Sequence, residues 1–394
     1  MKRVWSVGAV AVAAFACAWS AHAATPAVDL RSAVGVYRFA DGSAAALVEQ
    51  DGALRLVDYR TGALRSLEPR SRTLLVGGPG VSVTAPVAVR VTLVAGPRNA
   101  VTAIRLDGKL AARIPVQTLS AGYADGGVRL AGRLLLPAGR GPFPAVELVP
   151  GSVPATRDTY DLWAMFFVSR GFAVLSSDKR GIGASTGTYV RAATDANLRN
   201  LAADAVAGVE WLKARHDIDP HRIGLSGGSQ AGWVIELAAS QSPDVHFAAL
   251  ESGPAMSVGR QLAYSGVTHQ GAVDPTDAEI HAALDGAPDS GLDPRPLLAA
   301  LRIPLLWQLG SVDKRMYTPE TLANLATIEA SGRHDFTIHV YPGGAHSLRL
   351  TAHGTIAEET TSPGFVPGVF ADLAGWLRRF VSASGQGIRG PRWQ

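Results

Sequence analysis

Two serines in the segment 222–234, RIGLSGGSQAGWV, have the surroundings of a catalytic nucleophile. The first residues of this segment predict a strand, small residues follow, and an apolar pattern at helical spacing then resumes. A sharp strand-to-helix turn is therefore expected between the two elements. In an open α/β sheet, a serine at the tip of such a turn lies above the carboxyl ends of the strands. The N-terminus of the next helix then favours an oxyanion formed there.

The two serines differ in their position relative to this turn. The literal G-x-S-x-G pattern is GLSGG at 224–228, centred on Ser226, whereas GGSQA at 227–231 is centred on Ser229 and has alanine in the last place. Ser226 still ends the strand, while Ser229 falls in the turn between small residues that permit a close approach of strand and helix. We therefore predict that Ser229 is the nucleophile and that Ser226 is a buried hydroxyl bonded to the backbone.

An acid and a base that could activate this serine follow downstream in the chain. Asp313 comes just after the apolar strand pattern at 304–309, and His346 comes in a Gly-rich loop just after the pattern at 336–341. The carboxyl ends of parallel strands meet at one edge of a sheet, so both side chains are expected near Ser229. A histidine that takes the serine proton works best when a carboxylate orients it. Asp335 is the alternative acid, and the other histidines lie at loops, polar ends or strand interiors.

Backbone N–H groups that could stabilise an oxyanion are expected at two places. One is the N–H of Gln230, directly after the predicted nucleophile. The other belongs to the loop 149–154, VPGSVP, in which Gly151 permits unusual backbone angles and Ser152 or Val153 would be the donor. A plain surface turn is the alternative interpretation of this loop.

The composition is that of a globular chain with a substantial core. Of its 394 residues, 47% are hydrophobic and 18% are charged, which is unlike a disordered polypeptide. The net charge is +4, of which Lys2 and Arg3 contribute two units, and no basic cluster is interleaved with aromatic residues. Nucleic acid is therefore not an expected partner.

Residues 1–24 are predicted to be a secretory signal peptide. They combine a basic start, an apolar run and an Ala-His-Ala site at 21–23, and the run is shorter than the roughly 20 residues that a membrane-spanning anchor needs. Cys17 is the only cysteine and would leave with the signal, so the mature chain would have no disulfide, thiolate metal site or cysteine nucleophile. We expect a periplasmic or secreted bacterial protein without stable membrane insertion.

The remaining chain divides into two regions with different patterns. Residues 25–116 show short β-type runs separated by turn signals and predict a small all-β domain. Residues 117–382 alternate strands with helices, which indicates a doubly wound, mostly parallel sheet, and 383–394 form a loose tail. The segment 253–301 is longer than one crossover helix needs and predicts a small helical lid. Its neighbourhood supplies four candidates to line the pocket, with plain packing as the alternative: Met256, Tyr264, Trp307 and Met316.

The region 117–381 resembles the α/β-hydrolase superfamily. It is most similar to the esterase branch related to dienelactone hydrolases, bile-acid-CoA acyltransferase-like thioesterases and prolyl-oligopeptidase-like enzymes. The segments that carry the resemblance include LLLP at 134–137, DKRGIG at 178–183, DPHRIGL at 219–225, GGSQAG at 227–232 and the loops of Asp313 and His346. Two positions depart from the pattern: many relatives have His-Gly where this chain has Pro150 and Gly151, and Ala231 stands where glycine is usual.

The resemblance implies a serine hydrolase that needs no metal or organic cofactor. It assigns Ser229 as nucleophile, Asp313 as acid and His346 as base, and makes 178–181 a structural turn whose charges brace the loops below the site. A carboxylic-ester hydrolase acting on a small-molecule ester is the leading hypothesis, and a thioesterase or peptidase of the same fold is the alternative. A binding protein without catalytic activity is a further alternative, although such a protein would not need all three residues.

Overall fold

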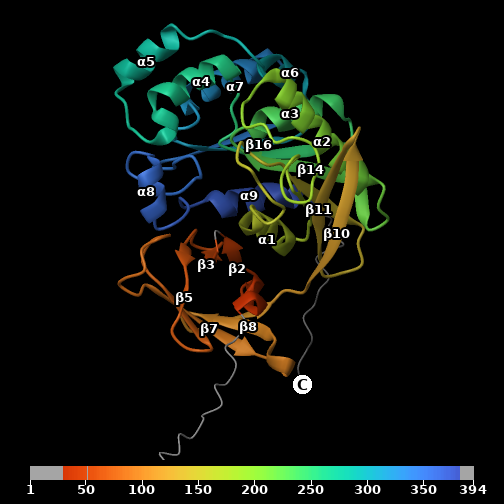
Figure 1. The fold of residues 1–394 in the computed structure, drawn as a ribbon, viewed down its shortest axis with the longest axis vertical. Helices are drawn as coiled ribbons and strands as arrows, with labels where there is room; N and C mark the ends of the chain where they lie inside the picture. Colours follow the sequence, from red (N-terminus) through yellow and green to blue (C-terminus); the bar gives the residue numbers. More distant parts are fainter. Residues whose placement is uncertain (1–29, 51, 382–394) are drawn as a thin grey trace, which may run out of the picture.

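Two sheets form the frame of the molecule, which is known from a computed structural model that describes residues 30–50 and 52–381 (Figure 1). The N-terminal sheet belongs to a β domain, and the second sheet is flanked by helices. The α/β class with a β-rich N-terminal domain is thus confirmed. The predicted signal peptide, residues 1–24, and the predicted tail, residues 383–394, lie outside the described residues.

The N-terminal sheet has nine strands in the order β4-β3-β2-β1-β9-β8-β7-β6-β5. All of its neighbouring pairs that have a described register are antiparallel, as in the β1–β2 and β7–β8 pairs. The strands are β1 Gly35–Phe39, β2 Ala44–Gln50, β3 Ala53–Asp58, β4 Leu64–Ser66, β5 Glu68–Pro69, β6 Leu74–Gly77, β7 Val89–Ala95, β8 Val101–Leu106 and β9 Lys109–Arg113.

Both faces of this small sheet are buried, although in different cores. Along β2, Ala46 and Val48 pack into a core shared with the helices of the second domain, while Ala45 and Leu47 pack into a separate core within the β domain. This alternation follows from the two-residue period of a strand. The β domain is therefore fastened to the rest of the molecule by apolar burial.

Tyr59 anchors this contact between the domains. Its ring lies edge-on to Phe166 and to Phe370, with centroid distances of 5.2 Å and 4.9 Å. Its hydroxyl donates a hydrogen bond to the Leu162 carbonyl at 2.6 Å, which satisfies the one polar atom that the burial would otherwise leave unpaired.

The second sheet has eight strands in the order β10-β11-β13-β12-β14-β15-β16-β17. β10, β11 and β13 are joined by antiparallel pairing, and every pair from β13 to β17 is parallel, in agreement with the predicted doubly wound sheet. The strands are β10 Val116–Asp125, β11 Val128–Pro137, β12 Phe143–Leu148, β13 Ala173–Ser177, β14 Ile218–Gly228, β15 Phe247–Glu251, β16 Leu305–Gly310 and β17 Phe336–Tyr341.

Helices cover the two faces of this sheet. α2, α3, α6 and α7 pack on one face, and α1 and α9 pack on the other, between the sheet and the β domain (Figure 1). The helices are α1 Asp161–Ser169, α2 Asp195–Lys213, α3 Ala231–Gln241, α4 Val258–Val267, α5 Asp277–Asp285, α6 Arg295–Ala300, α7 Thr318–Ser331, α8 Ile356–Thr361 and α9 Val369–Leu377. Short 3-10 turns occur at Leu30–Ala33, Pro97–Asn99, His269–Gly271 and Arg378–Phe380.

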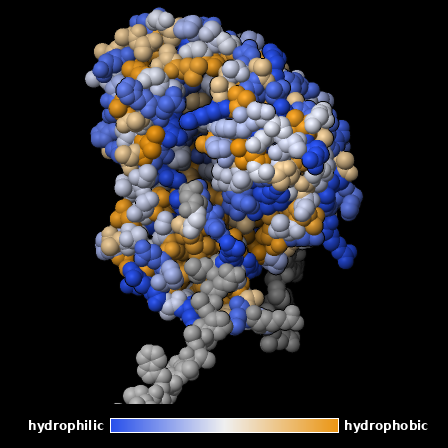
Figure 2. Space-filling view, in the orientation of Figure 1, coloured by the Kyte–Doolittle hydropathy of each residue, from blue (hydrophilic) through white to orange (hydrophobic). Residues whose placement is uncertain are grey.

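The surface of the molecule mixes polar and apolar side chains over both domains on the face seen in Figure 2. None of the helices in residues 30–50 and 52–381 is both long and apolar enough to cross a bilayer.

Candidate active site

Ser229 occupies the turn between β14 and α3. β14 ends at Gly228 and α3 begins at Ala231. Ser229 has φ 62°, in the left-handed region that a serine seldom adopts, and its N–H donates to the Glu251 carbonyl at 3.0 Å. A Cβ added at Gly227 would lie 2.4 Å from the Val149 carbonyl oxygen, so the close approach at this turn requires glycine there. This strained, tightly packed turn is the geometry expected of an exposed nucleophile.

Ser226 lies inside β14, three residues before the turn. Its backbone pairs with Leu148 of β12 on one side and Ala249 of β15 on the other. Ser226 and Ser229 both line the same cavity, but Ser229 alone of the two lies in the turn. Ser226 thus lies in the strand as predicted, but the prediction of a buried hydroxyl is wrong, because the residue is only half-buried and lines the cavity.

His346 and Asp313 are in direct contact. His346 Nδ1 lies 2.9 Å from Asp313 Oδ2 and 3.1 Å from Oδ1, and the carboxylate is fully buried. Asp313 Oδ1 also accepts the backbone N–H groups of Arg315 and Met316 at 2.7 Å and 2.9 Å. These bonds fix the carboxylate, which in turn fixes the imidazole and its Nδ1–H tautomer.

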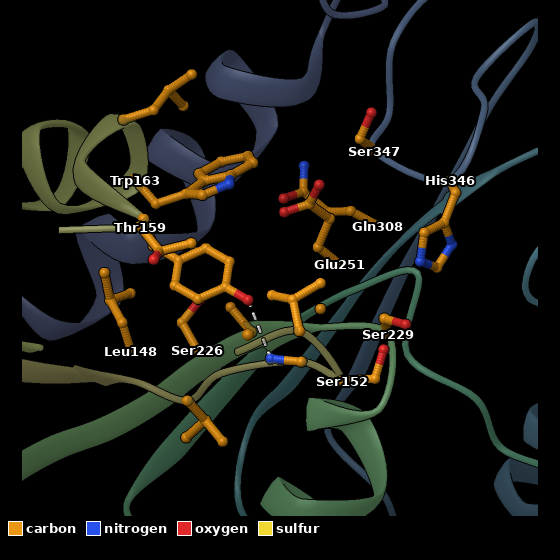
Figure 3. Close-up of a pocket in the computed structure, with 18 of the residues that line it drawn as sticks. Leu148, Ser152, Thr159, Trp163, Ser226, Ser229, Glu251, Gln308, His346 and Ser347 are labelled. Carbon is orange, nitrogen blue, oxygen red and sulfur yellow. Dashed lines mark hydrogen bonds between the residues drawn. The ribbon is translucent and has the colours of Figure 1, made fainter. Parts of the chain in front are cut away.

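The environment of His346 favours its protonated form. Burial by itself lowers the pKa of this imidazole, but the adjacent Asp313 carboxylate outweighs burial and raises the pKa above its ordinary value. The imidazole of His346 lies above Ser229 in Figure 3, and both residues line one cavity. Asp335, the alternative acid, lies at the opposite end of the sheet, where it forms an exposed ion pair with Arg379.

The loop of Gly151, Ser152 and Val153 lies against the turn that carries Ser229. A Cβ added at Gly151 would lie 3.0 Å from the Gly228 carbonyl oxygen and 3.7 Å from the Ser229 Cβ. The Gly151 N–H donates to the Tyr160 hydroxyl at 3.1 Å. The N–H groups of Ser152 and Val153 bond to no group in the described residues, so either can serve a ligand. Gln230 precedes α3, so its N–H lies at the N-terminus of that helix.

Lys179 connects the two places at which oxyanion donors were predicted. Its Nζ donates to the Gly151 carbonyl at 2.6 Å and to Gln230 Oε1 at 3.2 Å. Burial lowers the pKa of Lys179 to about 8, against the opposing effect of Asp204. The Tyr189 hydroxyl adds a bond to the Ser152 carbonyl at 2.6 Å. The sequence predicted that charges at 178–181 brace nearby loops, but it gave no signal for these partners.

A cavity of about 350 Å³ opens beside Ser229 and His346 (Figure 3). Its lining combines apolar and aromatic side chains with carboxyl and amide groups. The apolar side includes Leu148, Leu162, Trp163, Phe365 and Leu373, and the polar side chains include Gln50, Glu251, Gln308, Arg315, Ser347 and Arg349.

The prediction that residues near a helical lid line this cavity is wrong. Met256, Tyr264, Trp307 and Met316 are buried in packing contacts, and no residue of 253–301 lines the cavity. The segment does contain α4, α5 and α6, but it supports the acid loop instead. The Tyr264 hydroxyl donates to the Asp313 carbonyl at 2.6 Å, and the Gln261 amide donates to the Arg315 carbonyl at 2.6 Å.

Residues 159–365 match the family model of the prolyl oligopeptidase family, which is more than half of the 394-residue chain. The chain belongs to the prolyl oligopeptidase family. It is a serine hydrolase with the α/β-hydrolase fold.

Solved structures with a similar fold include several hydrolases. The esterase Pf2001 of Pyrococcus furiosus is 16% identical, with a TM-score of 0.50 over 68% of this chain and 92% of that one. A 2,6-dihydroxy-pseudo-oxynicotine hydrolase is 17% identical, with a TM-score of 0.48 over 68% of this chain and 69% of that one. A dienelactone hydrolase of Anabaena variabilis is 17% identical, with a TM-score of 0.43 over 68% and 99%. At these identities the likeness to the esterase concerns the fold alone.

In this member of the prolyl oligopeptidase family, the β domain forms part of the cavity wall. Gln50 of β2 lines the cavity directly. The segment that contains Phe365 is hydrogen-bonded to the β domain at two places. The Phe365 N–H donates to the Gly62 carbonyl at 2.8 Å, and the Val81 N–H donates to the Ser362 carbonyl at 2.9 Å. The role of the β domain could not be predicted from sequence, because these contacts join segments about 300 residues apart.

We expect Gly62→Ala to disturb this wall and Gly42→Ala to leave it intact. Both glycines have positive φ, +77° at Gly62 and +84° at Gly42. A Cβ added at Gly62 would lie 2.7 Å from the Phe365 carbonyl oxygen, whereas a Cβ added at Gly42 would meet no atom within 4 Å. Gly42→Ala should lower the free energy of unfolding by about 1 kcal/mol through the backbone alone. Gly62→Ala should lower it by about 2–4 kcal/mol and raise the KM for nitrophenyl butyrate several-fold.

Urea unfolding and steady-state kinetics of the two variants would test this expectation. Equal losses of stability and equal KM values in Gly42→Ala and Gly62→Ala would show that the Phe365 segment gives way without consequence for the cavity.

Proposed function

We propose that this protein is a carboxylic-ester hydrolase that works through an acyl-enzyme on Ser229. The observation that carries the proposal is the hydrogen bond between His346 Nδ1 and the buried Asp313 carboxylate. His346 lines the same cavity as Ser229, which lies at the strand-to-helix turn. A serine, a histidine base and a carboxylate that orients the base are the three parts that acyl transfer to serine requires.

In the proposed reaction, His346 Nε2 removes the proton of the Ser229 hydroxyl while the oxygen attacks the substrate carbonyl. Asp313 holds the imidazole through Nδ1 and stabilises the imidazolium that forms. The same imidazolium then protonates the departing alcohol. A water molecule, deprotonated by His346, attacks the acyl-enzyme in the second half of the reaction and releases the acid, which restores Ser229.

The negative charge of each tetrahedral intermediate would be stabilised by the N–H of Gln230 and by that of Ser152 or Val153. We assign Lys179 as a positioning residue for these donors, because its ammonium group binds the Gly151 carbonyl and the Gln230 side chain at once. No group of three His, Cys, Asp or Glu side chains in residues 30–50 and 52–381 has the placement of metal ligands, and no step of this mechanism uses a metal.

Peptide hydrolysis is the second candidate, and the match of residues 159–365 to the prolyl oligopeptidase family favours it. Against it, the N-terminal domain is one nine-stranded sheet, whereas a propeller needs about four or more separate four-stranded blades. A thioester would react through the same intermediate.

We further propose export to the periplasm or medium through the signal at 1–24, in keeping with a small extracellular substrate.

The mature protein should be assayed against nitrophenyl esters of increasing acyl length, the matching thioesters and peptide nitroanilides, with fluorophosphonate labelling in parallel. We expect labelling and ester turnover, with kcat/KM falling at acid pH as His346 takes up a proton and can no longer act as a base. Turnover of nitroanilides alone would favour the peptidase. Absence of labelling and of all turnover would leave a binding protein that keeps the hydrolase fold.

A further inference from the structure

Glu251 places a carboxyl group directly beside the predicted nucleophile, although the proposed mechanism does not use it. It is the last residue of β15 and the register partner of Gly228, the residue before Ser229. Its carbonyl accepts the Ser229 N–H at 3.0 Å. Its side chain lies in the cavity together with those of Ser229 and His346 (Figure 3).

The Glu251 carboxylate has no hydrogen-bond partner within residues 30–50 and 52–381. Burial is the main reason that the pKa of this carboxyl is raised to about 8. The positive charges of His346 and Arg349 lower the pKa, and the negative charges of Glu359 and Asp313 raise it further. An ionised carboxyl in such a place is costly unless a cationic partner joins it.

A second residue that lines the same cavity, Gln308, also leaves an acceptor oxygen for a ligand. Gln308 is the register partner of Glu251 on β16, and both hydrogens of its amide are engaged, by the Tyr341 hydroxyl at 2.8 Å and the Val369 carbonyl at 2.9 Å. Its Oε1 is therefore the atom left for a ligand. We call Glu251 and Gln308 the acceptor group.

Aromatic rings complete the surroundings of this acceptor group. Trp163, Tyr160 and Phe365 line the cavity, and the rings of Trp163 and Phe365 meet edge-on at 5.6 Å. Arg315 and Arg349, which also line it, belong to the loops of Asp313 and His346, and Arg349 Nη1 donates to the Glu359 carbonyl at 3.2 Å. Acceptor oxygens combined with aromatic faces suit a group that is both cationic and rich in hydrogen-bond donors.

We propose that the acceptor group binds a protonated amine of the substrate, so that the enzyme acts on amino-acyl esters or on amides with a free amine near the scissile carbonyl. The inference rests on the proposed function and specifies its substrate class. An ammonium group can donate to the Glu251 carboxylate and to the Gln308 oxygen on the neighbouring strand, and its charge offsets the cost of burying the ionised Glu251 carboxylate.

The test uses nitrophenyl esters in matched pairs in which an ammonium group replaces a terminal methyl: glycine against propionate, 3-aminopropionate against butyrate, and 5-aminopentanoate against hexanoate. Each kcat/KM is divided by the rate of uncatalysed hydrolysis of the same ester, because amino esters are intrinsically more reactive. We expect wild type to prefer the ammonium member of at least one pair by about tenfold or more, as a hydrogen bond to a charged group would give.

Glu251→Gln should abolish that preference, because the neutral amide has nearly the same shape but no charge. The preference is a ratio measured within one variant, so a loss of folded or active protein cancels. Glu210→Gln, at an exposed position of α2, is the matched control and should keep the wild-type ratio. Butylammonium chloride should also protect wild type, but not Glu251→Gln, from fluorophosphonate labelling better than 1-butanol does.

Suppose that wild type hydrolyses the nitrophenyl esters whose acyl chain ends in a methyl group but does not prefer the ammonium member of any pair. This result would overturn the inference and leave the proposed function standing. A preference that survives in Glu251→Gln would overturn it as well. Absence of labelling and of turnover with every ester would instead refute the proposed function on which the inference rests.

Discussion

Replacing Ser229 with alanine is expected to reduce kcat/KM for nitrophenyl butyrate by at least about 10⁴-fold and to abolish fluorophosphonate labelling. The reason is that the hydroxyl forms the covalent bond in both half-reactions, and alanine has no atom that can replace it. The left-handed backbone of this residue, at φ 62°, costs alanine about as much as serine, so the fold should persist.

Ser226→Ala is the matched control for this prediction, since it removes the same kind of atom three residues earlier in the chain, within β14. Ser226 is held within β14 by pairing on both sides and lies outside the turn, so its variant should still be labelled and should retain activity within about tenfold of wild type. Mass spectrometry of the labelled wild-type peptide should place the adduct on Ser229. Labelling that persists in Ser229→Ala and disappears in Ser226→Ala would reverse the assignment of the nucleophile.

Much of the fold could be predicted from sequence because its elements have strong local signals. The segments 247–250 and 336–341 are short apolar runs between turn residues, and they form β15 and β17 almost at the predicted bounds. Asp313 and His346 could be placed at one edge of the sheet because each follows a parallel strand directly. Their distance of 2.9 Å, by contrast, depends on how two loops fold back on the sheet.

The parts of the site that sequence did not predict depend on contacts between distant segments. Glu251 is simply the last residue of an apolar strand until the pairing with β14 places it beside Ser229. The pocket-lining prediction was wrong for the same reason: Tyr264 looked like an aromatic available to a pocket, but its hydroxyl donates to the Asp313 carbonyl. Length and composition showed an insertion at 253–301, but they held no information on which side of the active site it packs.

Lys179→Met is the second variant for which we expect a large effect. Its kcat should fall by about 100-fold, and its KM should change by less than about threefold. Methionine keeps most of the volume of the lysine side chain but removes the donor that holds the Gly151 carbonyl and Gln230 Oε1. Loss of one oxyanion donor, or its displacement by about 1 Å, lowers kcat on the order of 10²-fold, because the donor stabilises the transition state more than the bound substrate.

The pH profile separates this positioning role from a general loss of stability. Because the pKa of Lys179 is about 8, wild type should lose part of its kcat as the pH rises through that value and the ammonium group becomes a neutral amine with weaker hydrogen bonds. Lys179→Met should lack this alkaline limb, and its affinity for a boronic acid inhibitor should fall in parallel with kcat/KM. Lys213→Met, at an exposed ion pair with Asp244, should behave as wild type. A Lys179→Met enzyme with an unchanged alkaline limb and unchanged boronic acid affinity would show that Lys179 only stabilises the fold, because the two oxyanion loops would then keep their geometry without it.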